Sequence, residues 1–196
     1  MAPRPRSPRS ARASARPLPS WPTCTAPDAI RLIRRLEPHG LLFAEAPCAP
    51  EDIEGQAAVA RAVGVPVALG EELRTVFEWV PRLERRCMGI GQPEMGRTGI
   101  TEFARIGALC HAHHLAVMPH AAIGAGLFMA ASLQAASTLQ RLPWHEYQHS
   151  IFDPNLRLTQ PTGTRHMACD AGFYTLPDGP GLGVEPSRAL LAMLTA

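Results

Sequence analysis

Short apolar runs alternate with segments of helical hydrophobic spacing along the chain from about residue 25. The apolar runs predict five strands, over residues 41–46, 66–71, 88–94, 115–120 and 142–147. The intervening segments predict helices, over residues 25–40, 50–64, 75–87, 98–114 and 124–137. Strands and helices that alternate in this way are typical of right-handed crossovers, so we expect an α/β fold with a parallel sheet.

A polar residue follows each apolar run at nearly one period. The five are Glu45, Glu71, Glu94, His120 and Glu146, which lie 26, 23, 26 and 26 residues apart. In a closed β/α barrel the carboxyl ends of all strands share one face, so these side chains would meet in one pocket. An open doubly wound sheet would spread them along a crevice. Each acid taken alone could also cap the helix that follows it.

The first 24 residues differ from the rest of the chain. They are rich in Pro, Arg, Ser and Ala, contain no acid and show no hydrophobic periodicity, so we expect a disordered leader over 1–24 and the folded domain over 25–196. The prolines do not fit an amphipathic transit peptide, and a basic arm for nucleic acid would need aromatic residues and a downstream basic patch. The net charge of +2 comes from this segment, and we expect no nucleic-acid partner.

Cysteine usage and hydropathy restrict the class of protein further. The five cysteines are scattered and form no CxxC pair, which argues against a disulfide framework or a zinc ribbon and predicts reduced thiols in the cytoplasm. The chain has no apolar run of about 18 residues, so we expect no membrane partner. Every basic residue is arginine, since the sequence contains no lysine.

Carboxylates and an imidazole at one strand edge suit a hard divalent cation beside a proton-transfer group. Oxygen ligands from Glu45 and Glu71 favour magnesium. A carboxylate substrate bound to such an ion has its α-proton acidified, and a base is then needed within reach. His120 is the candidate base, with Glu94 orienting its imidazole; the alternative is a hydrogen-bonded structural histidine.

The chain resembles the enolase superfamily, and within it the mandelate racemase and muconate lactonizing enzyme branch. The matching stretches, in the family's order, are FAEAPCAPEDIEG, VPVALGEELRT, QPEMGRTGITEFARIGALCHAHHLAVMPH, LPWHEYQ and LPDGPGLGVE. The resemblance implies a (β/α)₈ barrel of which this chain holds strands four to eight, with Mg²⁺ and a metal-stabilised enediolate. It implies that Glu45 and Glu71 are metal ligands and that Glu94 and His120 form an acid-histidine dyad. Glu146 is implied to bind or polarise the substrate carboxyl.

Three departures from the family pattern lead to an alternative. The dyad acid is glutamate where the branch normally has aspartate, the aspartate ligand expected before the first helix is missing, and the strand-two lysine base cannot exist without lysine. A full barrel also needs about 250 residues, against 196 here. The alternative is therefore a truncated, catalytically inactive remnant that lacks the first metal ligand, the lysine base and the capping domain.

The function expected from the resemblance is that of a magnesium-dependent acid-sugar dehydratase or racemase acting on a small carboxylate such as a sugar acid. Dehydratase is preferred, because His120 is the one remaining proton-transfer group and racemisation needs bases on both faces of the substrate. A homo-oligomer that completes the half barrel is a third alternative.

Overall fold

The computed structural model describes residues 24–121, 124 and 126–194. The leader expected over residues 1–24 lies outside the described residues, except for Cys24. No helix in the described part of the chain is long and apolar enough to cross a membrane.

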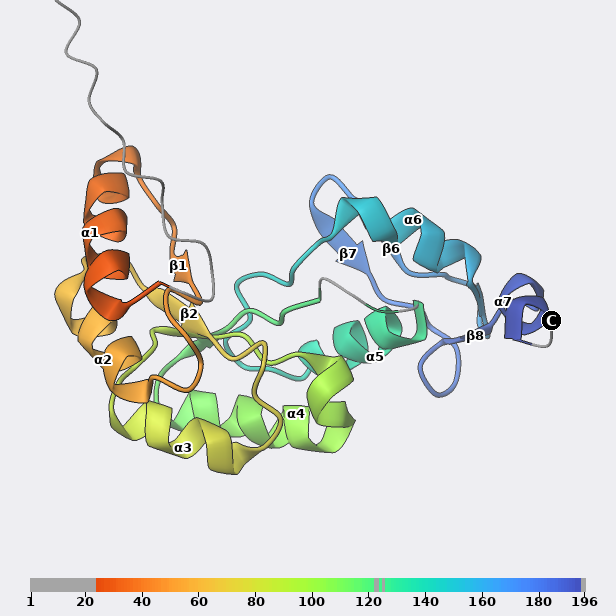
Figure 1. Ribbon diagram of the computed structural model, residues 1–196. Coiled ribbons are helices and arrows are strands. Elements are labelled where there is room, and N and C mark those ends of the chain that lie inside the picture. Colours follow the sequence, from red (N-terminus) through yellow and green to blue (C-terminus); the bar gives the residue numbers. More distant parts are fainter. Residues whose placement is uncertain (1–23, 122–123, 125, 195–196) are drawn as a thin grey trace, which may run out of the picture.

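Helices and short strands alternate through the first part of the chain (Figure 1). In chain order the elements are α1 (Ala26–Leu36), the 3₁₀-helix η1 (Glu37–His39), β1 (Ala44–Glu45), α2 (Ile53–Ala62), β2 (Val67–Leu69), α3 (Val76–Glu84), β3 (Ile90–Gly91), α4 (Met95–Ala112), β4 (Ala116–Val117), α5 (Gly126–Ala136), α6 (His149–Arg157), β5 (Thr159–Pro161), β6 (Ala168–Asp170), β7 (Phe173–Thr175), β8 (Val184–Pro186) and α7 (Arg188–Leu194).

Strands β1 to β4 form one parallel sheet in sequence order. Ala44 pairs with Val67, Ala68 with Ile90, and the register continues from β3 to β4. The order never reverses, as it would at the switch point of a doubly wound sheet, and this unbroken succession is the arrangement of a barrel wall. The expected α/β fold with a parallel sheet is therefore confirmed.

Local sequence signals explain where the helices begin and end. Thr25 accepts a hydrogen bond from the backbone N–H of Asp28 and so caps α1. Helix α2 begins three residues later than expected from Pro50, because the Asp52 side chain caps it through Gly55. Helix α4 begins earlier than expected and contains a kink at Gly99, whose φ of +68° only glycine adopts easily.

The fifth expected strand, 142–147, is not formed as a regular strand. The segment still lies beside the extension of β4, since the N–H of Val117 donates to the carbonyl of Arg141 and the N–H of Glu146 donates to that of Pro119. Pro143 lacks an N–H, so no continuous ladder can form there. The prediction of a strand was wrong, but the segment occupies the neighbouring position in the sheet.

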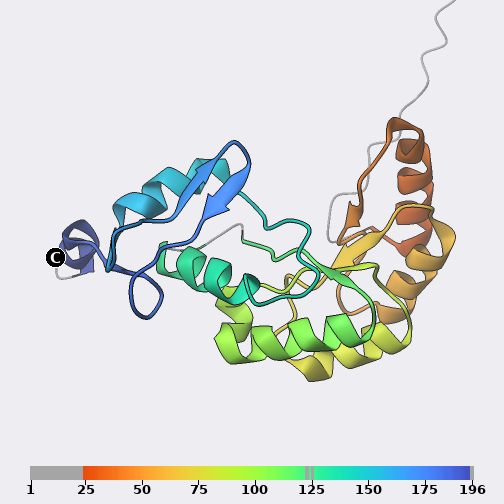
Figure 2. The ribbon, with the colours of Figure 1, turned by 180° about the vertical axis from the view of Figure 1, so that it is seen from behind.

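Helices α1 to α4 cover one side of the sheet, as Figures 1 and 2 show from opposite directions. The largest core cluster lies between these helices and the sheet and includes Trp79, Leu69, Leu73 and Ile106, all almost fully buried. A smaller cluster of Ala68, Ile90 and Met118, with Phe43 packed against it, lies apart from this core. These cores hold the carboxyl ends of the strands in fixed positions.

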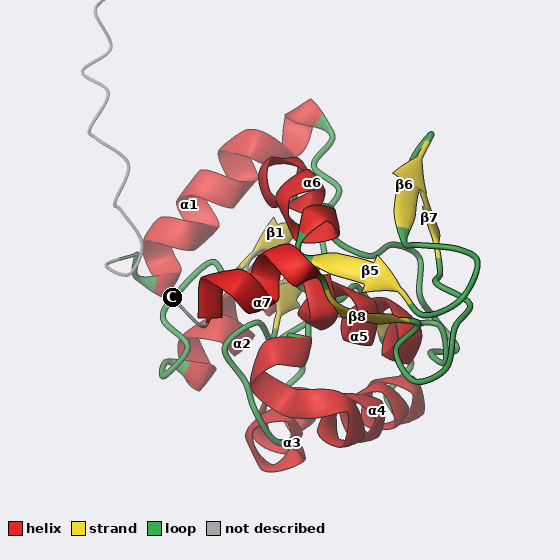
Figure 3. Ribbon diagram, turned by 90° about the vertical axis from the view of Figure 1, so that its right-hand side faces the viewer, coloured by secondary structure: helices red, strands yellow, loops and turns green. Residues whose placement is uncertain are grey.

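The C-terminal part of the chain packs around α5. Helix α5 contacts α4 and α6 as well as β8, and its buried residues join a cluster with Phe152, Met167 and Val184. Two antiparallel pairs, β5 with β8 and β6 with β7, complete this end of the molecule (Figure 3). Helix α7 lies far from α1 in Figure 1.

Candidate active site

His120 and Glu94 lie side by side at the carboxyl ends of neighbouring strands. Glu94 follows β3, His120 follows β4, and the two residues form an isolated parallel bridge. The Nδ1 atom of His120 lies 2.6 Å from Oε2 of Glu94, and both side chains are largely buried. The extra methylene of glutamate is accommodated without loss of this contact. Glu94 also occupies the N-cap position of α4, but its side chain makes no capping hydrogen bond.

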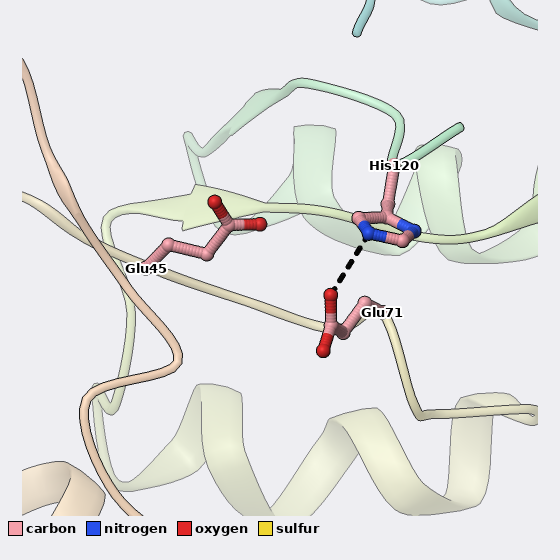
Figure 4. A group of neighbouring side chains, drawn as sticks. All are labelled: Glu45, Glu71 and His120. Carbon is pink, nitrogen blue, oxygen red and sulfur yellow. Dashed lines mark ion pairs between the residues drawn. The ribbon is translucent and has the colours of Figure 1, made fainter. Parts of the chain in front are cut away.

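Two more carboxylates approach the other edge of the imidazole (Figure 4). Oε2 of Glu71 lies 2.9 Å from Nε2 of His120. Glu45, from the end of β1, points its carboxylate toward the same ring in Figure 4. One ligand atom from each of Glu45, Glu71 and His120 lies within 4.8 Å of the other two.

Glu146 approaches from the segment beside β4. Its Oε2 atom accepts a hydrogen bond from the backbone N–H of Ala121 and lies 3.8 Å from Nε2 of His120. The backbone carbonyl of Glu146 accepts a hydrogen bond from the Tyr174 hydroxyl, and ring nitrogen Nδ1 of His145 lies 2.9 Å from the same oxygen. The four acids singled out by their spacing therefore all lie around the imidazole of the fifth residue, His120.

Burial and neighbouring negative charge both affect the pKa of Glu45. Its pKa is raised above the ordinary value of 4.5, first by burial of the carboxylate against the protein and then by the charge of Glu71. A hydrogen bond donated by Nε2 of Gln92 to Oε1 of Glu45, 3.0 Å long, works in the opposite direction. Converging carboxylates are the donor set expected of a hard-cation site.

A pocket of about 660 Å³ opens beside the dyad, within the usual size range of small-molecule sites. It is lined by Glu71, Glu94, Gly96, Arg97, His120, Gly124 and Phe128. The ring of Phe128 lies against Gly96, where an added Cβ would be only 3.0 Å from the ring. Larger side chains there would push the ring aside.

Sequence reasoning missed Gln92, Arg97 and Phe128. Gln92 lies two residues before Glu94, and alternate residues of an extended strand face the same side, so its position was open to prediction. Arg97 and Phe128 come from different helices, and no spacing rule connects them. Only the packing of α4 against α5 brings them to one pocket.

Comparison with known proteins assigns the family. The enolase C-terminal domain-like family matches residues 20–190. The chain belongs to this family. A putative isomerase from Sinorhizobium meliloti has a similar structure, with a TM-score of 0.82 and 55% identity over 86% of this chain and 43% of that one. A mandelate racemase/muconate lactonizing enzyme-like protein from Roseovarius sp. TM1035 has a TM-score of 0.74 and 31% identity, over 85% of this chain and 40% of that one.

Among curated proteins, the chain is similar to a D-galactonate dehydratase from Ralstonia nicotianae. The two are 32% identical over 170 residues, which is 85% of this chain and 44% of the relative. The chain thus spans less than half the length of that enzyme. The resemblance to the mandelate racemase branch of the enolase superfamily, expected from sequence motifs, is confirmed by these matches.

Proposed function

We propose that this chain carries the reaction centre of a magnesium-dependent acid-sugar dehydratase. The observation that carries the proposal is the position of the His120 imidazole, held by Glu94 at Nδ1 and facing Glu71 at Nε2. The similarity to a D-galactonate dehydratase supports a sugar acid as the substrate class.

Glu45 and Glu71 would hold the magnesium ion. Their oxygens are hard ligands that lie close enough to share one ion, and the pKa of Glu45 is raised by burial and then by the charge of Glu71. The bound ion would polarise the substrate carboxylate and make its α-proton more acidic.

His120 would transfer the proton. The contact with Glu94 fixes the ring orientation and leaves Nε2 on the side of Glu71, and both His120 and Glu71 line the pocket in which a base would have to reach the substrate proton. Glu146, anchored by the N–H of Ala121, lies beside the same nitrogen and would bind the substrate carboxyl group.

Dehydration needs two bonds to break. The C2–H bond gives its proton to a base, and the C3 hydroxyl accepts a proton and leaves as water; the resulting enol becomes a 2-oxo-3-deoxy acid. One imidazole can serve both steps on one face of the substrate, whereas racemisation needs groups on two faces. His120 is the one histidine among the described residues that line the pocket, and the chain has no lysine.

The first test is a melting curve with and without Mg²⁺. Wild-type protein should gain stability, by about 2.7 kcal/mol at a hundredfold excess over the dissociation constant. Glu71→Gln should lose most of that gain, while Glu84→Gln, which removes an exposed carboxylate on α3, should keep it. No gain in wild type, or the same gain in Glu71→Gln, would contradict the metal site and favour the inactive alternative.

The second test follows the reaction. Incubation with D-galactonate and Mg²⁺ should form a 2-oxo acid, detected with semicarbazide, and His120→Asn should slow this by at least about 10²-fold. Exchange of the C2 proton in D₂O without 2-oxo acid formation would identify a racemase instead.

A further inference from the structure

Arg97 brings a guanidinium group to the same pocket as the dyad. It lies in the first turn of α4 and is exposed to solvent. Its backbone N–H donates to the carbonyl of Glu94, but the side chain forms no hydrogen bond or ion pair within the part of the chain that the structure describes. Arg82 on α3, by contrast, uses its guanidinium to bond Gln56 and two backbone carbonyls.

The stability of helix α4 does not explain why an arginine occupies position 97. The amino-terminal end of a helix carries partial positive charge, so a cation in the first turn is unfavourable there, and the first turn of α4 holds no acidic residue. The charge of Glu72 interacts with that of Arg97, but the two side chains form no direct ion pair. A residue that works against its local structure is often found at a binding site. The guanidinium of Arg97 is instead part of the pocket lining.

The pocket wall is divided by charge. At one end lie Glu71, Glu94 and His120, where the proposed metal and proton transfer would engage one carboxylate of a substrate. Arg97 adds a positive charge to the same lining, and the ring of Phe128 provides an apolar surface for the C–H groups of a sugar chain. A planar guanidinium matches a carboxylate with two parallel hydrogen bonds, and a neutral hydroxymethyl group cannot satisfy it in that way.

We propose that the substrate of this site is a sugar dicarboxylate, whose carboxylate distal to the reacting carbon binds Arg97. This inference rests on the proposed acid-sugar function. It goes further by choosing between sugar acids with one carboxylate and sugar acids with two. It separates this chain from the D-galactonate dehydratases to which it is similar, since D-galactonate carries a single carboxylate.

Two probes that differ at one carbon test the proposal. Galactarate and D-galactonate share the same hydroxyl stereochemistry, but C6 is a carboxylate in galactarate and a hydroxymethyl group in D-galactonate. Titration calorimetry with the full chain and Mg²⁺ should give a dissociation constant for galactarate about 10- to 100-fold lower than that for D-galactonate.

Variants assign the preference to Arg97. Arg97→Gln should remove the preference by weakening galactarate alone, and Arg97→Lys should keep part of it, because the charge remains without the planar fork. Arg61→Gln, which removes the same charge from the exposed side of α2, should leave both affinities unchanged. Melting curves should show all three variants at least as stable as wild type.

Failure of this inference can be told apart from failure of the proposed function. Equal affinities for the two acids in wild type, or a galactarate preference that persists in Arg97→Gln, would overturn the dicarboxylate proposal and leave the dehydratase proposal standing. If neither acid binds in the presence of Mg²⁺, both proposals fail. The wild-type comparison decides the matter even if a variant does not fold.

Discussion

Oε2 of Glu94 lies 2.6 Å from Nδ1 of His120, although glutamate is one methylene longer than the aspartate normally found in this branch. The bridge between the two residues and the hydrogen bond from the N–H of His120 to the carbonyl of Pro93 hold their backbones in register. The contact therefore depends on the length and charge of this glutamate.

Changing Glu94 should slow the proposed reaction. Glu94→Gln keeps the shape but removes the charge that stabilises an imidazolium, and Glu94→Asp withdraws the carboxylate by roughly one C–C bond, about 1.5 Å. We expect 2-oxo acid formation to fall about 10²-fold in Glu94→Gln and less in Glu94→Asp. A wild-type rate in Glu94→Gln would rule out an orienting role for this residue.

Removing the charge of Glu45 should stabilise the metal-free protein at neutral pH. The pKa of Glu45 is raised by burial and by Glu71, so the folded state holds this proton more tightly than the unfolded chain. This tighter proton binding stabilises the folded state. The stabilisation is complete below about pH 4.5 and is lost as the pH rises through the raised pKa of Glu45. Glu45→Gln should melt higher than wild type in EDTA at pH 7.5, with a difference that shrinks toward pH 4.

Magnesium should reverse the order of the melting temperatures of wild type and Glu45→Gln. Wild type gains stability from the ion and Glu45→Gln loses a ligand, so saturating Mg²⁺ should make wild type the more stable. Glu51→Gln, a change at an exposed carboxylate, controls for a general effect of net charge. If Glu45→Gln melts below wild type in EDTA at pH 7.5, the ionised carboxylate of Glu45 does not destabilise the folded protein.

Gly91 packs directly against the largest core side chain. A Cβ at this position would lie 2.9 Å from the Trp79 ring and 3.0 Å from Sγ of Cys110. Gly91→Ala should therefore destabilise the fold by about 1–3 kcal/mol through overpacking, measured by urea denaturation. At Gly64 the nearest atom would be 3.5 Å away, so Gly64→Ala should change stability by less than about 0.5 kcal/mol. Equal effects at the two sites would mean that the packing around Trp79 is loose.

Burial should protect two thiols from alkylation. It raises the pKa of Cys110 to about 12 and that of Cys48 to about 11. At pH 8 the thiolate fraction of Cys110 is then about 10³-fold below that of an ordinary thiol. In native protein iodoacetamide should modify the partly exposed Cys24 and Cys169 before the three buried cysteines, as mass spectrometry would show, and in urea the five cysteines should react alike. Rapid labelling of Cys110 in native protein would contradict its burial.

Much of this fold could be predicted from the chain because its periodicity is strong. The helix that begins at Thr25 has its cap, its early proline and its apolar face all in agreement, and the structure places it within one residue of the expected start. The segment 142–147 was harder, because its apolar residues surround a proline and only the contact with β4 decides its conformation.

The sequence by itself determined the alternation of strands and helices and the placement of five polar residues at strand ends, because both depend on local periodicity. Tertiary structure alone decided that these side chains meet at one imidazole, that Gln92 supports Glu45, and that Arg97 and Phe128 share their pocket. The reason is physical: sheet register and helix packing join residues that are far apart in the chain, and no local pattern encodes the distances between them.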